Sequence, residues 1–214
     1  MFITRAPFFR LLGWLSLSFL PLVATHGQLT GDLETIAPGT GIGLVRIGET
    51  RDDVIRSLGE PKLSDAAMGG KIVEVWRSGP AFAGRRQNGI EELDIYFRRE
   101  GAELNGQPIV RQIRVTSPFF RTGSGISVRS SFAQISREFP NLSIDEELTY
   151  AFSGGRSEKE IEIYVDRSRG IAFEFRRGAA ADPDAAGYCR GVHVFPPNTD
   201  PRPIQNFAEA PGED

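Results

Sequence analysis

Six short segments alternate between apolar and polar residues, and this alternation restricts the fold more than any other feature of the sequence. Successive side chains of a β-strand point to opposite faces, so such segments are typical of strands that bury one face. The pattern predicts strands over 71–76, 93–99, 110–115, 160–165, 171–177 and 191–195.

Each group of three strands follows a stretch with the spacing of a short helix. A hydroxyl cap, an apolar i, i+4 pair and a helix-breaking residue occur there in the same order, 81 residues apart. They are Thr50, Val54, Leu58 and Gly59 in the first stretch, and Ser131, Ile135, Phe139 and Pro140 in the second. The hydroxyls can accept a hydrogen bond from the amide three residues on, so a helix is expected after each of them.

A helix followed by three strands, found twice, predicts an α+β fold. We expect a tandem duplication of a helix and a three-stranded antiparallel meander, with the helices on one face of the sheet. The first unit would span 43–120 and the second 121–195, after a linker or N-terminal arm over 28–42. The end of the chain, 196–214, is Pro-rich and acidic, and it is expected to be disordered or to lie along the surface.

The first 27 residues have the organisation of a secretory signal peptide. Arg5 and Arg10 precede an almost wholly apolar run over 11–24, and small residues follow it. The run is shorter than the roughly 20 residues that a membrane span needs, and Pro21 interrupts it. Cleavage after Ala24 or Gly27 would deliver a periplasmic or secreted protein without a stable membrane span.

Few residues offer chemistry. Cys189 is the single cysteine, so no internal disulfide forms, and a lone cysteine is most often a small buried apolar residue. Cys189 and His193 lie four residues apart on one strand, about 13 Å, which is too far to share a metal ion. The carboxylates on the strands fit a solvated face. We therefore expect no catalytic residue, metal or cofactor.

Residues 47–65 read IGETRDDVIRSLGEPKLSD, with Gly48, Thr50, Val54, Leu58, Gly59 and Pro61 in a G-x-T-x-x-x-V-x-x-x-L-G-x-P pattern. This pattern resembles the helix-opening motif of the small SmpA/BamE-type proteins of bacterial outer-membrane assembly. A tandem pair of such units resembles the architecture of the β-lactamase inhibitor protein. The resemblance implies a non-enzymatic protein that works by protein–protein contact.

The strand alternation also predicts a binding surface, because several aromatic and arginine side chains fall on the outward positions. They are Trp76, Tyr96, Arg98, Arg114, Tyr164, Arg176 and His193. Trp, Tyr and Arg dominate binding energy at protein interfaces, whereas a solvated sheet face has little use for large rings. The alternative is that the rings belong to the core, because a register slip of one residue exchanges the two faces.

These features together predict an exported, non-catalytic protein-binding module of the bacterial envelope that uses the exposed sheet face. A net charge of −3 argues against nucleic acid as a partner. Two alternatives stay open: a carboxylate-based hydrolase, and a binder of a small ligand or an envelope polymer.

Overall fold

The computed structural model describes residues 33–65, 71–77, 91–99, 106–152, 161–176 and 187–204. The expected signal peptide, 1–27, and the end of the expected tail, 205–214, lie outside these residues.

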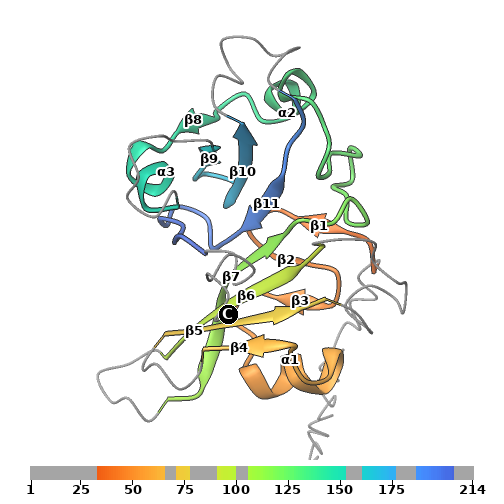
Figure 1. The fold of residues 1–214 in the computed structure, drawn as a ribbon, viewed down its shortest axis with the longest axis vertical. Coiled ribbons are helices and arrows are strands. Elements are labelled where there is room, and N and C mark those ends of the chain that lie inside the picture. Colours follow the sequence, from red (N-terminus) through yellow and green to blue (C-terminus); the bar gives the residue numbers. More distant parts are fainter. Residues whose placement is uncertain are drawn as a thin grey trace, which may run out of the picture. The chain divides into compact units, whose positions relative to one another are not determined.

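One antiparallel sheet of eight strands dominates the fold, with strand order β4-β5-β6-β7-β11-β10-β9-β8 (Figure 1). Its strands are β4 (Leu63–Ser64), β5 (Lys71–Trp76), β6 (Leu93–Arg99), β7 (Pro108–Val115), β8 (Ser143–Ile144), β9 (Ile161–Asp166), β10 (Ile171–Arg176) and β11 (Gly191–Val194). The sheet is continuous because β7 and β11 pair at its centre, with Val115 opposite Val192 and Ile113 opposite Val194. The six strands expected from alternation are confirmed to within two residues at each end, and β4 and β8 are additional short edge strands.

The two expected helices are confirmed, together with their caps. In α1 (Arg51–Leu58), the Thr50 hydroxyl accepts a hydrogen bond from the amide of Asp53. In α2 (Phe132–Glu138), Ser131 and Gln134 form a reciprocal capping box. Both helices bury the apolar positions that the spacing singled out, Val54 and Leu58 in α1 and Ile135 in α2.

Removing either cap hydroxyl should weaken the fold. Thr50→Ala and Ser131→Ala are each expected to lower the free energy of unfolding by about 1 kcal/mol, because an amide at the helix start loses its acceptor. Chemical unfolding followed by circular dichroism measures the loss. Serine at position 50 is the matched control, since it keeps the hydroxyl, and an alanine variant as stable as this control would contradict the prediction.

The second half of the expected linker or N-terminal arm contains strands, because residues 36–46 form a small sheet. Strands β1 (Ile36–Ala37), β2 (Gly41–Ile42) and β3 (Val45–Arg46) pair in that order, all antiparallel. Glycine is required at position 41, where a Cβ would lie 2.2 Å from the carbonyl oxygen of Val45. Ile36, Ile42 and Val45 are buried, so this sheet is part of the core.

The predicted α+β class, with two tandem helix-and-meander units, is wrong. The structure is mostly β: an eight-stranded antiparallel sheet and a three-stranded sheet, with three helices in the described part of the chain. The helices are only seven or eight residues long, and the third, α3 (Glu146–Phe152), was not expected. The helices cover less of the large sheet than the prediction required, because β1–β3 also pack against the core.

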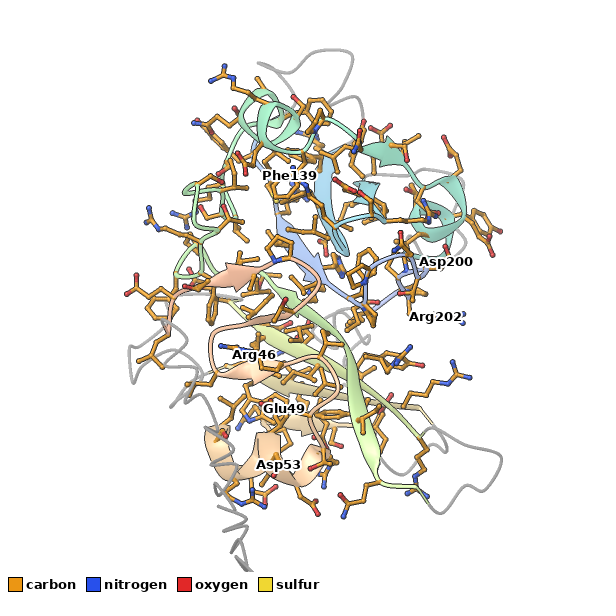
Figure 2. All side chains as sticks on the ribbon, turned by 180° about the vertical axis from the view of Figure 1, so that it is seen from behind. Arg46, Glu49, Asp53, Phe139, Asp200 and Arg202 are labelled. Carbon is orange, nitrogen blue, oxygen red and sulfur yellow. The ribbon has the colours of Figure 1, made fainter. Side chains whose placement is uncertain are left out.

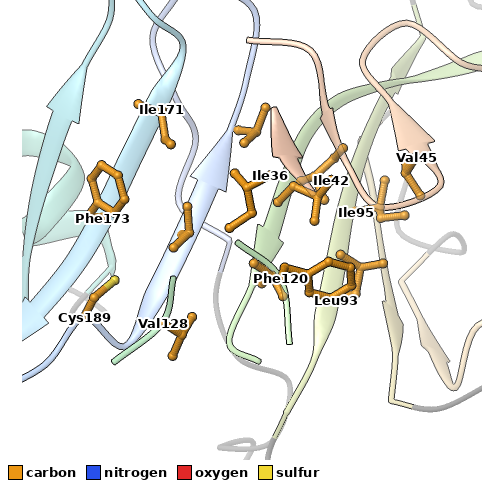
Figure 3. Packing of buried hydrophobic residues seen from close by; sticks show 14 of the residues in the cluster. Ile36, Ile42, Val45, Leu93, Ile95, Phe120, Val128, Ile171, Phe173 and Cys189 are labelled. Carbon is orange, nitrogen blue, oxygen red and sulfur yellow. The ribbon is translucent and has the colours of Figure 1, made fainter. Parts of the chain in front are cut away.

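Apolar side chains are buried on both faces of the large sheet. On one face, Leu93, Ile95 and Phe173 belong to a cluster that also includes Ile36, Ile42 and Val45 of the small sheet (Figure 3). Residues of both capped helices belong to the same cluster. On the other face, Leu148 of α3 packs in a smaller cluster with Ile163, Val165, Ala172 and Phe195. Much of the sheet therefore has no solvated face, and this feature decides where the expected binding residues lie.

The first part of the expected disordered tail is ordered. Residues 196–204 continue from β11, with Pro201 and Ile204 buried. The Asn198 amide donates to the carbonyl of Arg167, and Arg202 exchanges two hydrogen bonds with the Gln112 side chain. This part of the chain lies against the sheet because its backbone groups find partners there.

Candidate functional site

The expected exposed face of aromatic and arginine residues is wrong at five of its seven positions. The buried residues, with their exposed fractions, are Trp76 (2%), Tyr96 (6%), Arg114 (2%), Tyr164 (6%) and His193 (1%). Arg98 and Arg176 are exposed, but they do not form one surface. Strands β6 and β10 run in opposite directions within the sheet. Arg98, near the end of β6, and Arg176, at the end of β10, therefore lie at opposite ends of it.

A register slip of one residue explains the burial of two of the rings, Trp76 and Tyr164. Trp76 lies opposite Leu93 and therefore shares its face, which is the face of the main core. The Trp76 indole donates a hydrogen bond of 3.0 Å to the carbonyl of Gly59 at the end of α1. Tyr164 lies opposite Phe173 in the same way, and its ring packs edge-on against Phe132 and Phe175.

Two of the other expected residues, Arg114 and His193, do meet, in a buried ionic network at the centre of the sheet. Arg114 donates through Nε and Nη2 to the two carboxylate oxygens of Glu174, at 2.5 and 3.0 Å. Its Nη1 donates to Asp94 at 2.7 Å. The cross-strand pairs Asp94/Arg114 and Arg114/His193 place these side chains on one face of β6, β7 and β11.

His193 connects this network to the segment after β11. Its Nε2 lies 2.7 Å from Glu174 Oε1, and its Nδ1 lies 3.0 Å from Gln112 Nε2. Since the Gln112 amide nitrogen can only donate, His193 Nδ1 must accept this hydrogen bond. Nε2 must then carry the ring proton and donate a hydrogen bond to Glu174. The Gln112 side chain also donates to the Arg202 carbonyl and accepts from the Arg202 amide, in a segment that Figure 2 marks with the labels Asp200 and Arg202.

Glycine at position 191 makes room for the carboxylate at the centre of the network. Gly191 lies directly opposite Glu174 on the neighbouring strand. A Cβ at this position would approach the Glu174 carboxyl carbon to 2.5 Å. Any larger residue would displace the carboxylate that holds Arg114 and His193.

Burial and charge act in opposite directions on the pKa values of these groups. Burial alone would raise the pKa of Glu174, but the Arg114 charge and the His193 hydrogen bond hold it at about 2. Burial raises the pKa of Asp94 to about 6 against the opposing effect of Arg114. Burial also lowers the pKa of His193, which is therefore neutral at pH 7.

The raised pKa of Asp94 predicts a pH dependence of stability. The folded state holds the Asp94 proton more tightly than the unfolded state, where the pKa is near 3.8, so ionisation above pH 6 costs about 3 kcal/mol. This cost disappears as the pH falls through 6 towards 4. Asp94→Asn cannot titrate, so wild type should gain about 2 kcal/mol of unfolding free energy relative to this variant between about pH 7.5 and pH 4.

Urea unfolding of both proteins across this pH range measures the difference. The titrations of Glu174 and His193, whose lowered pKa values make acid destabilising, occur in both proteins and largely cancel. A difference that stays constant with pH would contradict the raised pKa of Asp94.

The network can support the fold but, as it stands, it cannot contact a substrate. Asp94, Arg114, Glu174 and His193 are each at most 2% exposed, and hydrogen bonds already join all four of them. Sequence reasoning missed Asp94 and Glu174, because alternating carboxylates on a strand are usually solvated. The sequence signal that could have indicated their burial is Arg114, which occupies a matching position on a third strand, β7.

Cys189 is buried, as expected for a lone cysteine. Its thiol donates to the carbonyl of Gly191 at 3.2 Å, and burial raises its pKa well above the ordinary range. It therefore stays protonated and unreactive in the folded protein. Among the described residues, no group of three His, Cys, Asp or Glu side chains is placed to hold a metal ion.

No helix among the described residues has the length and apolar character needed to cross a membrane.

Comparison with known proteins adds little. No protein-family model and no curated protein matches this chain, so the SmpA/BamE resemblance stays a prediction. One solved structure with some likeness is an extracellular protein containing an SCP domain from Bacillus anthracis str. Ames. It is 9% identical, with a TM-score of 0.38, over 70% of this chain and 44% of that one, so the chain spans less than half of its length.

A second solved structure is the uncharacterized protein yfeY from Escherichia coli, 10% identical over 74% of this chain and 98% of that one, with a TM-score of 0.37. TM-scores this low indicate neither a shared fold nor a shared function.

Proposed function

We propose that this chain is an exported, non-catalytic protein-binding module of the bacterial envelope. The proposal rests first on the leader, whose basic start, apolar run and small-residue exit are those of a secretory signal. Second, it rests on the burial within the sheet of the side chains that could act as nucleophile, acid or base.

That second observation carries the proposal. His193, Cys189, Asp94 and Glu174 are the nucleophile and acid–base candidates near the sheet centre, and each is at most 2% exposed. A general acid or base must come within hydrogen-bond reach of the substrate. Here the Nε2–H group of His193 donates a hydrogen bond to Glu174, and the Glu174 carboxylate already accepts hydrogen bonds from Arg114. A hydrolase built on these residues would have to break the core of the sheet before each turnover.

Affinity capture tests the proposal in the native bacterium. The full chain, with its leader and a C-terminal tag, is expressed at its natural level, crosslinked in intact cells, and purified from the envelope fraction. We expect one envelope protein at near-equal amounts, recovered again when that protein carries the tag instead. A tagged protein with an unrelated fold and the same leader is the matched control.

The same preparation tests export. The mature protein should begin between Thr25 and Leu29, as the small-residue exit implies. Recovery of intact Met1, or a chain that stays monomeric under crosslinking at every expression level, would contradict the proposal.

A further inference from the structure

We propose that Arg129, Arg176, Tyr188 and Arg190 form a docking surface for an acidic segment of a partner protein. We name these four residues the arginine–tyrosine surface. The inference rests on the proposed protein-binding function and adds the chemical nature of the partner and the place where it binds.

Backbone hydrogen bonds bring three segments together where β10 ends and β11 begins. The Arg129 amide donates to the carbonyl of Cys189, and the Cys189 amide donates to the carbonyl of Ser130, at 2.8 and 2.9 Å. The Arg190 amide donates to the carbonyl of Glu174 at 2.8 Å, two residues before Arg176. Tyr188 forms an isolated bridge with Ser131, the cap of α2. All four side chains are exposed, and Tyr188 is 65% exposed.

The three guanidinium groups have no carboxylate partner within the described part of the chain. Two exposed arginines elsewhere on the surface pair with carboxylates, Arg56 with Asp53 and Arg169 with Asp166. Arg167, at intermediate exposure, bridges Asp145 and Asp200. The carboxylate of Glu174 on the same strand as Arg176 is buried and already holds Arg114 and His193. Within the described residues, three positive charges therefore lie together without a carboxylate partner, on a chain whose net charge without residues 1–27 is (25 − 2) − 28 = −5.

The backbone at Arg129 gives a second, independent indication. Its φ is +77°, in the left-handed region that favours glycine; among the described residues the other non-glycine residue with positive φ is Asn198, which tolerates this region well. An arginine there stores strain that glycine or asparagine would avoid. Strain of this kind clusters at functional sites and persists because the surrounding structure holds it in place.

The chemistry of the surface favours an acidic protein segment over other anions. Arginine pairs with carboxylates in a planar two-point geometry, and an exposed tyrosine beside it supplies a rigid ring that can be buried on binding. Arg and Tyr are enriched together at the energetic centres of protein interfaces. A lipid headgroup would use the charges but would leave the ring without a protein surface to pack against.

A peptide of ten glutamates with a terminal fluorophore is a suitable probe, with fluorescence anisotropy as the readout. Arg176→Gln/Arg190→Gln removes two charges from the surface. Arg98→Gln/Arg202→Gln removes two exposed charges elsewhere and is the matched control. We expect the first variant to weaken binding by about tenfold relative to the control variant, and higher salt to weaken what remains.

Arg129→Asn separates a binding role from a structural one. Asparagine is at ease in the left-handed region, so the melting temperature should stay the same or rise while peptide affinity falls. A variant that melts earlier would assign Arg129 to the fold, and a variant that binds the peptide as wild type does would remove it from the surface. Tyr188→Ser should likewise weaken binding without changing the melting temperature.

Three further outcomes would overturn the proposal: no binding of the glutamate peptide, equal loss in the test and control variants, or binding to phosphatidylglycerol vesicles in place of the peptide. Failure here is distinguishable from failure of the proposed function. If the partner captured from cells is still captured by Arg176→Gln/Arg190→Gln, protein binding stands and only this surface is wrong. If no partner is captured with the wild-type chain, the proposed function itself is wrong.

Discussion

Replacing Arg114 with methionine is expected to lower the free energy of unfolding by about 3–5 kcal/mol. The side chain is 2% exposed, and its guanidinium holds Glu174 at two points and Asp94 at a third. Methionine fills much of the space but leaves two buried carboxylates without their positive charge. Urea unfolding followed by circular dichroism and tryptophan fluorescence measures the loss.

Two further variants identify the cause of that loss. Arg98→Met makes the same exchange at an exposed strand end and should change stability by no more than about 0.5 kcal/mol. Adding Asp94→Asn and Glu174→Gln to Arg114→Met should restore part of the loss, because the stranded charges are then removed as well. A loss below about 1 kcal/mol for Arg114→Met alone would show that the network does not support the sheet.

Trp76→Ala is the other change with a large expected effect, also about 3–5 kcal/mol. The ring is 2% exposed in the main core, and its indole nitrogen holds the end of α1 through the carbonyl of Gly59. Truncation leaves a cavity and an unpaired carbonyl. Tyr188→Ala, at an exposed ring, is the control and should leave stability nearly unchanged. A Trp76→Ala protein as stable as this control would contradict the burial of Trp76 in the core.

The elements that the sequence predicts correctly are those whose signal is local. The cap hydroxyls of Thr50 and Ser131 act within three residues, and both helices begin where these residues place them. Alternation over six or seven residues locates β6 and β10 for the same reason. Neither signal reports how many strands join one sheet, so the predicted fold class failed although most of its elements exist.

The face of a strand could not be predicted where both faces are buried. In β5, Ile72 and Trp76 point to one face and Val73 and Val75 to the other, so apolar residues occupy both registers. In β9, Tyr164 faces the main core while Ile163 packs with α3 on the other side. Alternation identifies such segments as strands but does not choose between their faces.

The small sheet and the buried network depend on contacts between distant parts of the sequence. Strands of two residues, such as β1 and β2, are too short to show a period. Arg114 and Glu174 are 60 residues apart, and their pairing follows only once β7 and β11 are known to be neighbours. The carboxylates of Asp94 and Glu174 therefore looked solvated in the sequence, although the sheet encloses them.

The closed network around His193 is tested most directly by a nitrogen-15 NMR titration of this imidazole, with His193→Gln used to assign its signals. The network predicts a neutral ring with the proton on Nε2, held by Glu174, and no protonation as the pH falls through the ordinary value of 6.5. An imidazole that titrates near 6.5, with its proton averaged over both ring nitrogens, would show that His193 is open to solvent and free to act on a substrate.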